Sequence, residues 1–130
     1  MILFFDRSVG VSIPKALREY LNPPDIAAIE YHDLHFEMDE GDDVWLPKVG
    51  EHDWFVIGQD HNYHNNSPEL EAIRQYGIGA FYLWGAEEHR WETMRCFARG
   101  YNNIVRRAAI EPRPFVFKVE RAGNLNQVFI

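Results

Sequence analysis

The sequence has very little cysteine and no long hydrophobic segment, and both shortages narrow the class of protein. Its single cysteine, Cys96, cannot form an internal disulfide, which suits a reducing compartment. No apolar run approaches the roughly 20 residues that a membrane span requires. The apolar start ends at Asp6, too early for a signal-peptide core. We therefore expect a cytoplasmic protein without a membrane segment, folded as one domain over residues 1–130.

Basic residues are also few relative to acidic ones, so the formal net charge is -7. Nucleic-acid-binding proteins usually present a basic surface, so charge alone does not predict such binding here. Several of the acids fall in one stretch: Glu37, Asp39, Glu40, Asp42 and Asp43. Such a cluster is either a solvated loop or a metal site, in which bound cations offset the negative charge. For most of these residues we prefer the solvated loop.

Apolar patterns predict strands and helices in alternation along the chain. The expected strands are 2–5, 26–31, 54–57, 79–83 and 115–119. The expected helices are 12–21, 43–50 with Asp43 as N-cap, 67–76 and 86–109, and their spacing assigns Tyr20, Leu21, Tyr76 and Trp91 to buried faces. This alternation indicates an α/β fold, a single three-layer domain with a mainly parallel sheet of about five strands and helices on both faces. We expect the strand order 2-1-3-4-5, because parallel crossovers are right-handed.

Two aspartates follow strands that this order places side by side. Asp6 comes directly after the first strand, and Asp60 follows the third strand within a few residues. In open α/β sheets, sites form at the carboxyl ends of strands where the strand order reverses. Two carboxylates at that edge repel each other unless a divalent cation lies between them. The alternative is that both acids are turn residues that cap backbone amides.

Three motifs in order resemble the PIN-like domains, most closely the compact branch related to VapC toxins. They are Phe4-Phe5-Asp6-Arg7-Ser8, Asp43-Val44-Trp45-Leu46-Pro47 and Val56-Ile57-Gly58-Gln59-Asp60. The likeness covers roughly residues 1–85, and beyond them only the layout agrees. No glycine-rich phosphate loop is present. Ser8 occupies the position where a haloacid-dehalogenase-like phosphatase has its second aspartate.

The resemblance implies a metal-dependent ribonuclease that uses Mg²⁺ or Mn²⁺ held by three or four acids. Asp6 and Asp60 are then ligands, and Asp43 is our choice for the third, with Asp42, Glu40 and Asp39 as alternatives. The predicted substrate-binding residues flank the two aspartates: Arg7, Ser8, His61 and Asn62. In many relatives a further acid follows the third one, whereas here the nearby polar positions are His61, Asn62 and His64. A weaker metal site, water-bridged ligation or lost catalysis would each explain this departure.

Histidines and arginines allow further interpretations. Zinc could be bound if His32, His35, His61 and His64 converged, although nothing in the sequence brings their loops together. Arg95, Arg99 and Arg106 form a stripe on the last long helix, as either phosphate contacts or a solvated face paired with Glu88 and Glu92. We prefer the solvated face. Cys96 lies in an apolar helical pattern, which predicts a buried structural thiol.

The leading functional hypothesis is a PIN-like endoribonuclease, the toxin of a type II toxin–antitoxin pair. Its expected partners are an RNA substrate, an antitoxin protein and a second copy in a homodimer. The alternative is a PIN-like module that binds RNA or protein without cutting it. A small metal-dependent phosphatase on a similar fold is a weaker alternative.

Overall fold

A computed structural model describes residues 1–37, 39–59, 68–85 and 89–130. The strands are β1 (Ile2–Phe5), β2 (Ala28–Tyr31), β3 (Phe55–Gln59), β4 (Gly79–Leu83), β5 (Phe115–Val119) and β6 (Leu125–Val128). The helices are η1 (Arg7–Val9), α1 (Ser12–Ala16), η2 (Leu17–Leu21), α2 (His32–His35), α3 (Asp42–Glu51), α4 (Pro68–Tyr76) and α5 (Arg90–Ile110). The predicted alternation of strands and helices is therefore confirmed.

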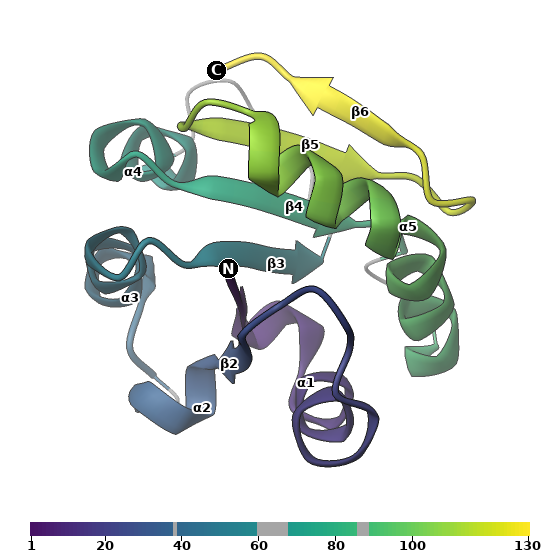
Figure 1. Ribbon diagram of the computed structural model, residues 1–130. Helices are drawn as coiled ribbons and strands as arrows, with labels where there is room; N and C mark the ends of the chain where they lie inside the picture. The colour runs from purple at the N-terminus through teal and green to yellow at the C-terminus, as the bar shows by residue number, and fades with distance from the viewer. Residues whose placement is uncertain (38, 60–67, 86–88) are drawn as a thin grey trace.

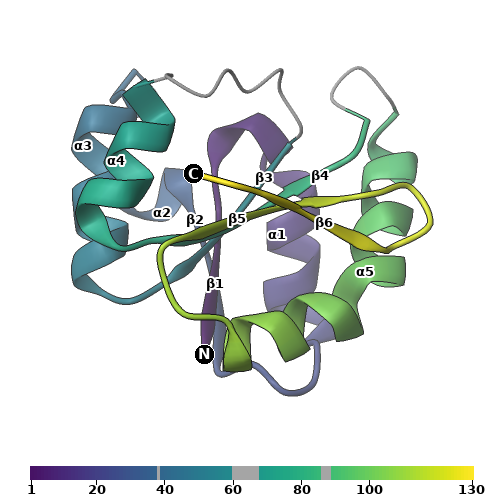
Figure 2. The same cartoon turned by 90° about the horizontal axis from the view of Figure 1, so that it is seen from above.

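The strands form one sheet in the order β2-β1-β3-β4-β5-β6. The pairs from β2 to β5 are all parallel, and β6 is antiparallel to β5. The predicted order of the first five strands is confirmed, and β1 lies between β2 and β3. The carboxyl ends of these three strands consequently share one edge of the sheet. Because α3, α4 and α5 each lead from one parallel strand to the next, they begin near this edge and run toward the opposite one (Figure 2).

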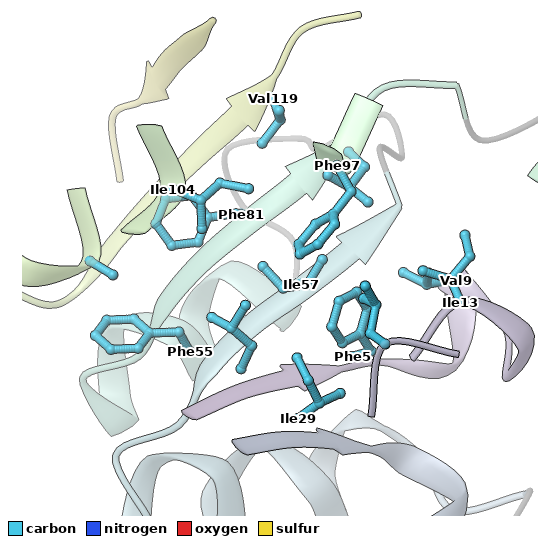
Figure 3. Close-up of a cluster of buried hydrophobic side chains, with 14 of the residues drawn as sticks. Phe5, Val9, Ile13, Ile29, Phe55, Ile57, Phe81, Phe97, Ile104 and Val119 are labelled. Carbon is cyan, nitrogen blue, oxygen red and sulfur yellow. The ribbon is translucent and has the colours of Figure 1, made fainter. Parts of the chain in front are cut away.

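Helices cover both faces of the sheet and make the predicted three layers (Figure 1). On one face, α1, η2 and α5 bury a cluster that includes Phe5, Ile57, Phe81 and Phe97 (Figure 3). On the other face, α3 and α4 bury a second cluster around Phe4, which stacks between two tryptophans, Trp45 and Trp54. Because side chains alternate along a strand, Phe4 and Asp6 lie on the same face of β1. Asp6 therefore faces the α3–α4 layer.

The structure corrects several predictions about individual elements. A sixth strand, β6, and a short helix, α2, were not expected from the sequence. Four aromatic or aliphatic residues assigned to buried helix faces are exposed: Tyr20, Leu21, Tyr76 and Trp91. The helix from residue 12 changes to π geometry at Leu17, so its last turn leaves the predicted phase. Tyr76 is the last residue of α4 and Trp91 the second residue of α5, so both lie at helix ends.

Candidate active site

Asp6 ends β1 as a buried carboxylate with only 5% of its surface exposed. Its backbone N–H donates to the Ile57 carbonyl at 3.0 Å, which joins the end of β1 to β3. Its Oδ1 accepts the Ser8 backbone N–H at 2.8 Å and also the Ser8 hydroxyl, and so caps η1. The turn-residue alternative is thus correct for this one oxygen of Asp6.

The other oxygen of Asp6, Oδ2, lies over Gly58 of β3. A β-carbon added to Gly58 would lie 2.8 Å from Oδ2 and 2.5 Å from the ring of Tyr82. Glycine at this position is therefore what allows the carboxylate and the phenol ring to approach each other across β3. The Tyr82 hydroxyl in turn donates to Glu69 Oε1 at 2.9 Å.

Glu69 and Tyr82 are site residues that the sequence analysis missed. Glu69 lies half-buried in the first turn of α4, where the helix dipole favours an acid. Tyr82 is fully buried in β4, and a buried tyrosine hydroxyl usually has a hydrogen-bond partner. The one available indication was this lone hydroxyl in an otherwise apolar strand.

Ser8 and Gln59 hold the carboxyl ends of three strands together. The Ser8 hydroxyl donates to Asp6 and accepts the Gln59 backbone N–H at 3.0 Å. The buried Gln59 amide donates to the Trp84 carbonyl at 3.1 Å and to Thr93 Oγ1 at 3.4 Å. The chain around Asp6 is thereby fixed to β3, to the end of β4 and to α5. Ser8 was predicted to bind substrate, and its hydroxyl here positions Asp6; substrate contact stays a prediction.

Asp43 is exposed and lies in the first turn of α3. This end of α3 lies at the edge of the sheet where β1 ends with Asp6 (Figure 2). The prediction that Asp43 is the N-cap is wrong, because Gly41 occupies that position with extended backbone and no side chain. The extended backbone at Gly41 makes the helix begin at Asp42, one residue before Asp43. Asp43 is therefore free of a capping role, and its role as a metal ligand stays a prediction.

The alternatives to Asp43 behave as loop residues where they are described. Glu40 Oε1 accepts the Glu37 backbone N–H at 3.2 Å, and Asp39 is exposed. The side chain of Asp42 lies outside the described part of the chain, as do Asp60, His61, Asn62 and His64. Arg7 is described and exposed directly beside Asp6. The predicted roles of all these residues stay predictions.

Within the ranges that the structure covers, no three histidine, cysteine or acidic side chains converge as a metal site. His35 bonds Glu30 Oε2 at 2.6 Å, whereas His32 packs its ring against Phe36 and Trp45. These two histidines therefore form no zinc site with the described residues around them. Asp60, the acid next to Gln59, lies outside the described residues, so its part in a metal site stays a prediction.

The arginine stripe on α5 is paired within the protein. Arg95 Nη1 lies 3.0 Å from Glu92 Oε1, and Arg121 Nη2 lies 3.7 Å from Glu92 Oε2. Arg99 donates to the Arg121 carbonyl, and Arg106 to Asn103. These contacts support the solvated, paired face over a row of phosphate contacts, although Glu88 lies outside the described residues.

Cys96 is a structural thiol, as predicted. It is buried in α5, and its Sγ approaches the Val119 and Glu120 carbonyls at 3.5 and 3.4 Å. Burial raises the pKa of the Cys96 thiol above its ordinary value, since the charged thiolate is poorly solvated there. A neutral buried thiol is a weak nucleophile.

Among the described helices, none is long and apolar enough to cross a membrane. No curated protein and no solved structure matches the chain. A family model described as a PIN like domain matches residues 1–85, which hold β1 to β4 and every predicted site residue. PIN-like domains are commonly nucleases and typically use divalent metals. The predicted resemblance is thereby confirmed, and the chain belongs to the PIN-like domain family.

Proposed function

We propose that this chain is a metal-dependent endoribonuclease whose catalytic acids are Asp6, Asp43 and Asp60. The observation that carries the proposal is the Asp6 carboxylate, buried at the edge where the strand order reverses. A carboxylate is rarely buried unless it is paired, hydrogen-bonded or bound to metal. Ser8 satisfies Oδ1 of Asp6, and Oδ2 lies on the side of Gly58 and Tyr82.

The donor chemistry at this edge suits Mg²⁺ or Mn²⁺, which prefer carboxylate oxygens and water. Asp6 provides a rigid ligand, because Ser8 and the Ile57 carbonyl fix its position. Asp43 and Asp60 complete the proposed set. A bound divalent cation supplies charge stabilisation and an activated water for phosphodiester hydrolysis. Arg7, His61 and Asn62 are proposed to contact the substrate, and Arg7 is exposed beside Asp6 for this purpose.

The test compares RNA cleavage by the wild type, Asp6→Asn and Asp25→Asn, each with Mg²⁺ or Mn²⁺. Asp25 is an exposed acid that precedes β2 and lies at the opposite edge, so its substitution removes the same charge away from the site. We expect metal-dependent cleavage by the wild type and Asp25→Asn, and a loss of at least about a hundredfold for Asp6→Asn. Equal cleavage by all three proteins would exclude Asp6 from catalysis.

A second candidate function is a PIN-like module that binds RNA or protein without cutting it. It is favoured by the departure from the family pattern after Asp60, where the nearby polar positions are His61, Asn62 and His64 instead of a further acid. This candidate predicts that the wild type neither cleaves RNA nor gains thermal stability from Mn²⁺. The phosphatase alternative is weaker, because the position of its second aspartate is held by Ser8, whose hydroxyl bonds Asp6 and Gln59.

The proposal extends to a cytoplasmic toxin that is inhibited by an antitoxin and forms a homodimer. Exposed apolar side chains support a protein partner, since Tyr20 and Leu21 of η2 are 78% and 59% exposed. They lie beside β2, the parallel edge of the sheet. Expression of the wild type should arrest growth, and expression of Asp6→Asn should not. Growth that is unaffected by the wild type would remove the toxin role and leave the nuclease proposal standing.

A further inference from the structure

A small pocket of about 270 Å³ opens beside Asp6, between the segment after β1 and the end of β2. Its lining consists of Asp6, Arg7, Gly10, Val11, Tyr31, His32 and Asp33. Phe5 and Tyr31 are paired in the sheet, and Asp6 and His32 are the residues that follow them. Whatever occupies the pocket therefore lies next to the carboxylate that we assign to catalysis.

His32 is the unexplained polar group of this pocket. Its side chain is 1% exposed, and neither ring nitrogen has a hydrogen-bond partner among the residues that the structure describes. Nδ1 lies 3.7 Å from Asp33 Oδ1, which is too far for a hydrogen bond. A buried imidazole without partners destabilises the protein, so its presence requires an explanation. A ligand that offers a hydrogen-bond donor and an acceptor to the two ring nitrogens would explain it.

Position and rigidity of the pocket wall also suit a binding site. The Arg90 guanidinium of α5 donates to the Val9 carbonyl and packs directly under Gly10. A β-carbon at Gly10 would lie 2.5 Å from that guanidinium, and the positive φ of 82° there favours glycine. The wall formed by Gly10 and Val11 is thereby held in place by α5.

Size and charge restrict the occupant. Drug-sized ligands fill clefts of about 300–1,000 Å³, so this pocket lies just below that range and has room for one heterocyclic base. The pocket lining carries more negative than positive charge, because it has the carboxylates of Asp6 and Asp33 but only the guanidinium of Arg7. An anion such as a phosphate group is therefore disfavoured there. A neutral planar group with hydrogen-bonding edges suits it better. Unstacked RNA bases have these properties, and proteins bind them through arginine planes and hydrogen bonds to their edges.

We infer that this pocket binds one base of single-stranded RNA, next to the phosphodiester that is cut. The inference rests on the proposed function and names a subsite for its substrate. The base lies against Val11 and the Arg7 side chain, and its edge hydrogen-bonds His32 and Asp33. The Asp33 side chain is 41% exposed, so it has room to move aside from Nδ1 when the base enters.

The test measures binding of labelled RNA oligonucleotides by fluorescence anisotropy, with Ca²⁺ in place of Mg²⁺ or Mn²⁺. Four oligonucleotides differ in one central base, and a fifth lacks that base. We expect the wild type to bind at least one of the four about tenfold more tightly than the abasic oligonucleotide, because base stacking contributes on this scale. Equal affinity for all five, or no binding to any, would overturn the inference.

Two pocket variants and one matched control separate the subsite from general effects. His32→Phe keeps the packing against Phe36 and Trp45 but removes both nitrogens, and Val11→Trp fills the pocket from an exposed position. Both variants should bring the ratio of the affinity for the preferred oligonucleotide to the affinity for the abasic one close to one. His35→Phe makes the same change at a histidine outside the pocket and should keep the ratio. A ratio that both pocket variants preserve would contradict the inference.

Stability measurements distinguish a binding histidine from a structural one. His32→Phe should melt at the same temperature as the wild type or higher, because it removes unsatisfied buried nitrogens, while it loses base discrimination. If His32→Phe does not fold, the exposed Val11→Trp variant decides the question alone. Cleavage without base discrimination would refute this subsite and leave the nuclease proposal intact. Base discrimination without cleavage would support the subsite and refute the nuclease.

Discussion

Gly58→Ala should destabilise the protein through a contact at the candidate site. The added methyl group would lie 2.5 and 2.6 Å from two ring carbons of Tyr82 and 2.8 Å from Asp6 Oδ2. Tyr82 is fully buried and bonded to Glu69, so its ring has no room to move away. Either β3 or the Asp6 carboxylate must therefore shift.

Two opposing effects determine the size of the change in unfolding free energy. Overpacking in a well-packed core costs about 1–3 kcal/mol. Replacement of glycine by alanine lowers the conformational entropy of the unfolded chain, which stabilises the folded state by roughly 0.4–1 kcal/mol. We expect a net loss of about 1–2 kcal/mol, measured by urea denaturation. In a domain of this size, that loss lowers the melting temperature by roughly 3–8 °C.

A second substitution tests whether the Tyr82 ring is the cause. In a Tyr82→Leu background the ring contact is absent and only the contact with Asp6 Oδ2 remains, so Gly58→Ala should cost less, with a coupling free energy above about 1 kcal/mol. If the Asp6 carboxylate is the group that shifts, metal affinity should also fall in Gly58→Ala. An unchanged melting temperature in the single variant, or the same loss in both backgrounds, would refute the reasoning.

The remaining predictions concern Gln59 and Cys96. Gln59→Leu should cost about 2 kcal/mol in urea denaturation, because it leaves the Trp84 carbonyl and the Thr93 hydroxyl without this donor; a loss below about 0.5 kcal/mol would show that water replaces the amide. The Cys96 thiol should react with a thiol reagent only after denaturant is added, and rapid labelling of the folded protein would contradict its burial. Its pKa is raised in the fold, so the unfolded thiol ionises first, near its ordinary 9.0, and the unfolding free energy should fall as the pH rises above that value. Cys96→Ala should lack this fall, and an identical pH profile for both proteins would contradict the assignment.

The sheet was largely predictable because its strands are short apolar runs separated by helical patterns. The missed strand β6 has polar residues, Asn126 and Gln127, at its centre, and as an edge strand it needs no apolar run. The missed helix α2 has only four residues, too few to show helical periodicity. Exposure of Trp91 could not be predicted, since it depends on where α5 crosses the edge of the sheet.

The candidate site was predictable only in part. Asp6 could be chosen from its place after the first strand, because topology alone brings that position to the functional edge. Ser8 holds Asp6 from two positions away, but the contacts around this pair join side chains distant in sequence: Gln59 reaches Thr93 across 34 positions, and Tyr82 reaches Glu69 across 13. The unsatisfied nitrogens of His32 are likewise a property of packing that no local pattern reveals.

Binding of Mn²⁺ measured by isothermal titration calorimetry tests the central claim most directly, since it separates the metal site from cleavage. The wild type and the matched charge control Asp25→Asn should bind Mn²⁺ with the same affinity. Asp6→Asn should bind it at least tenfold more weakly, because the amide replaces a buried anionic ligand. Equal Mn²⁺ affinity in Asp6→Asn and the wild type would contradict the assignment of Asp6 as a metal ligand.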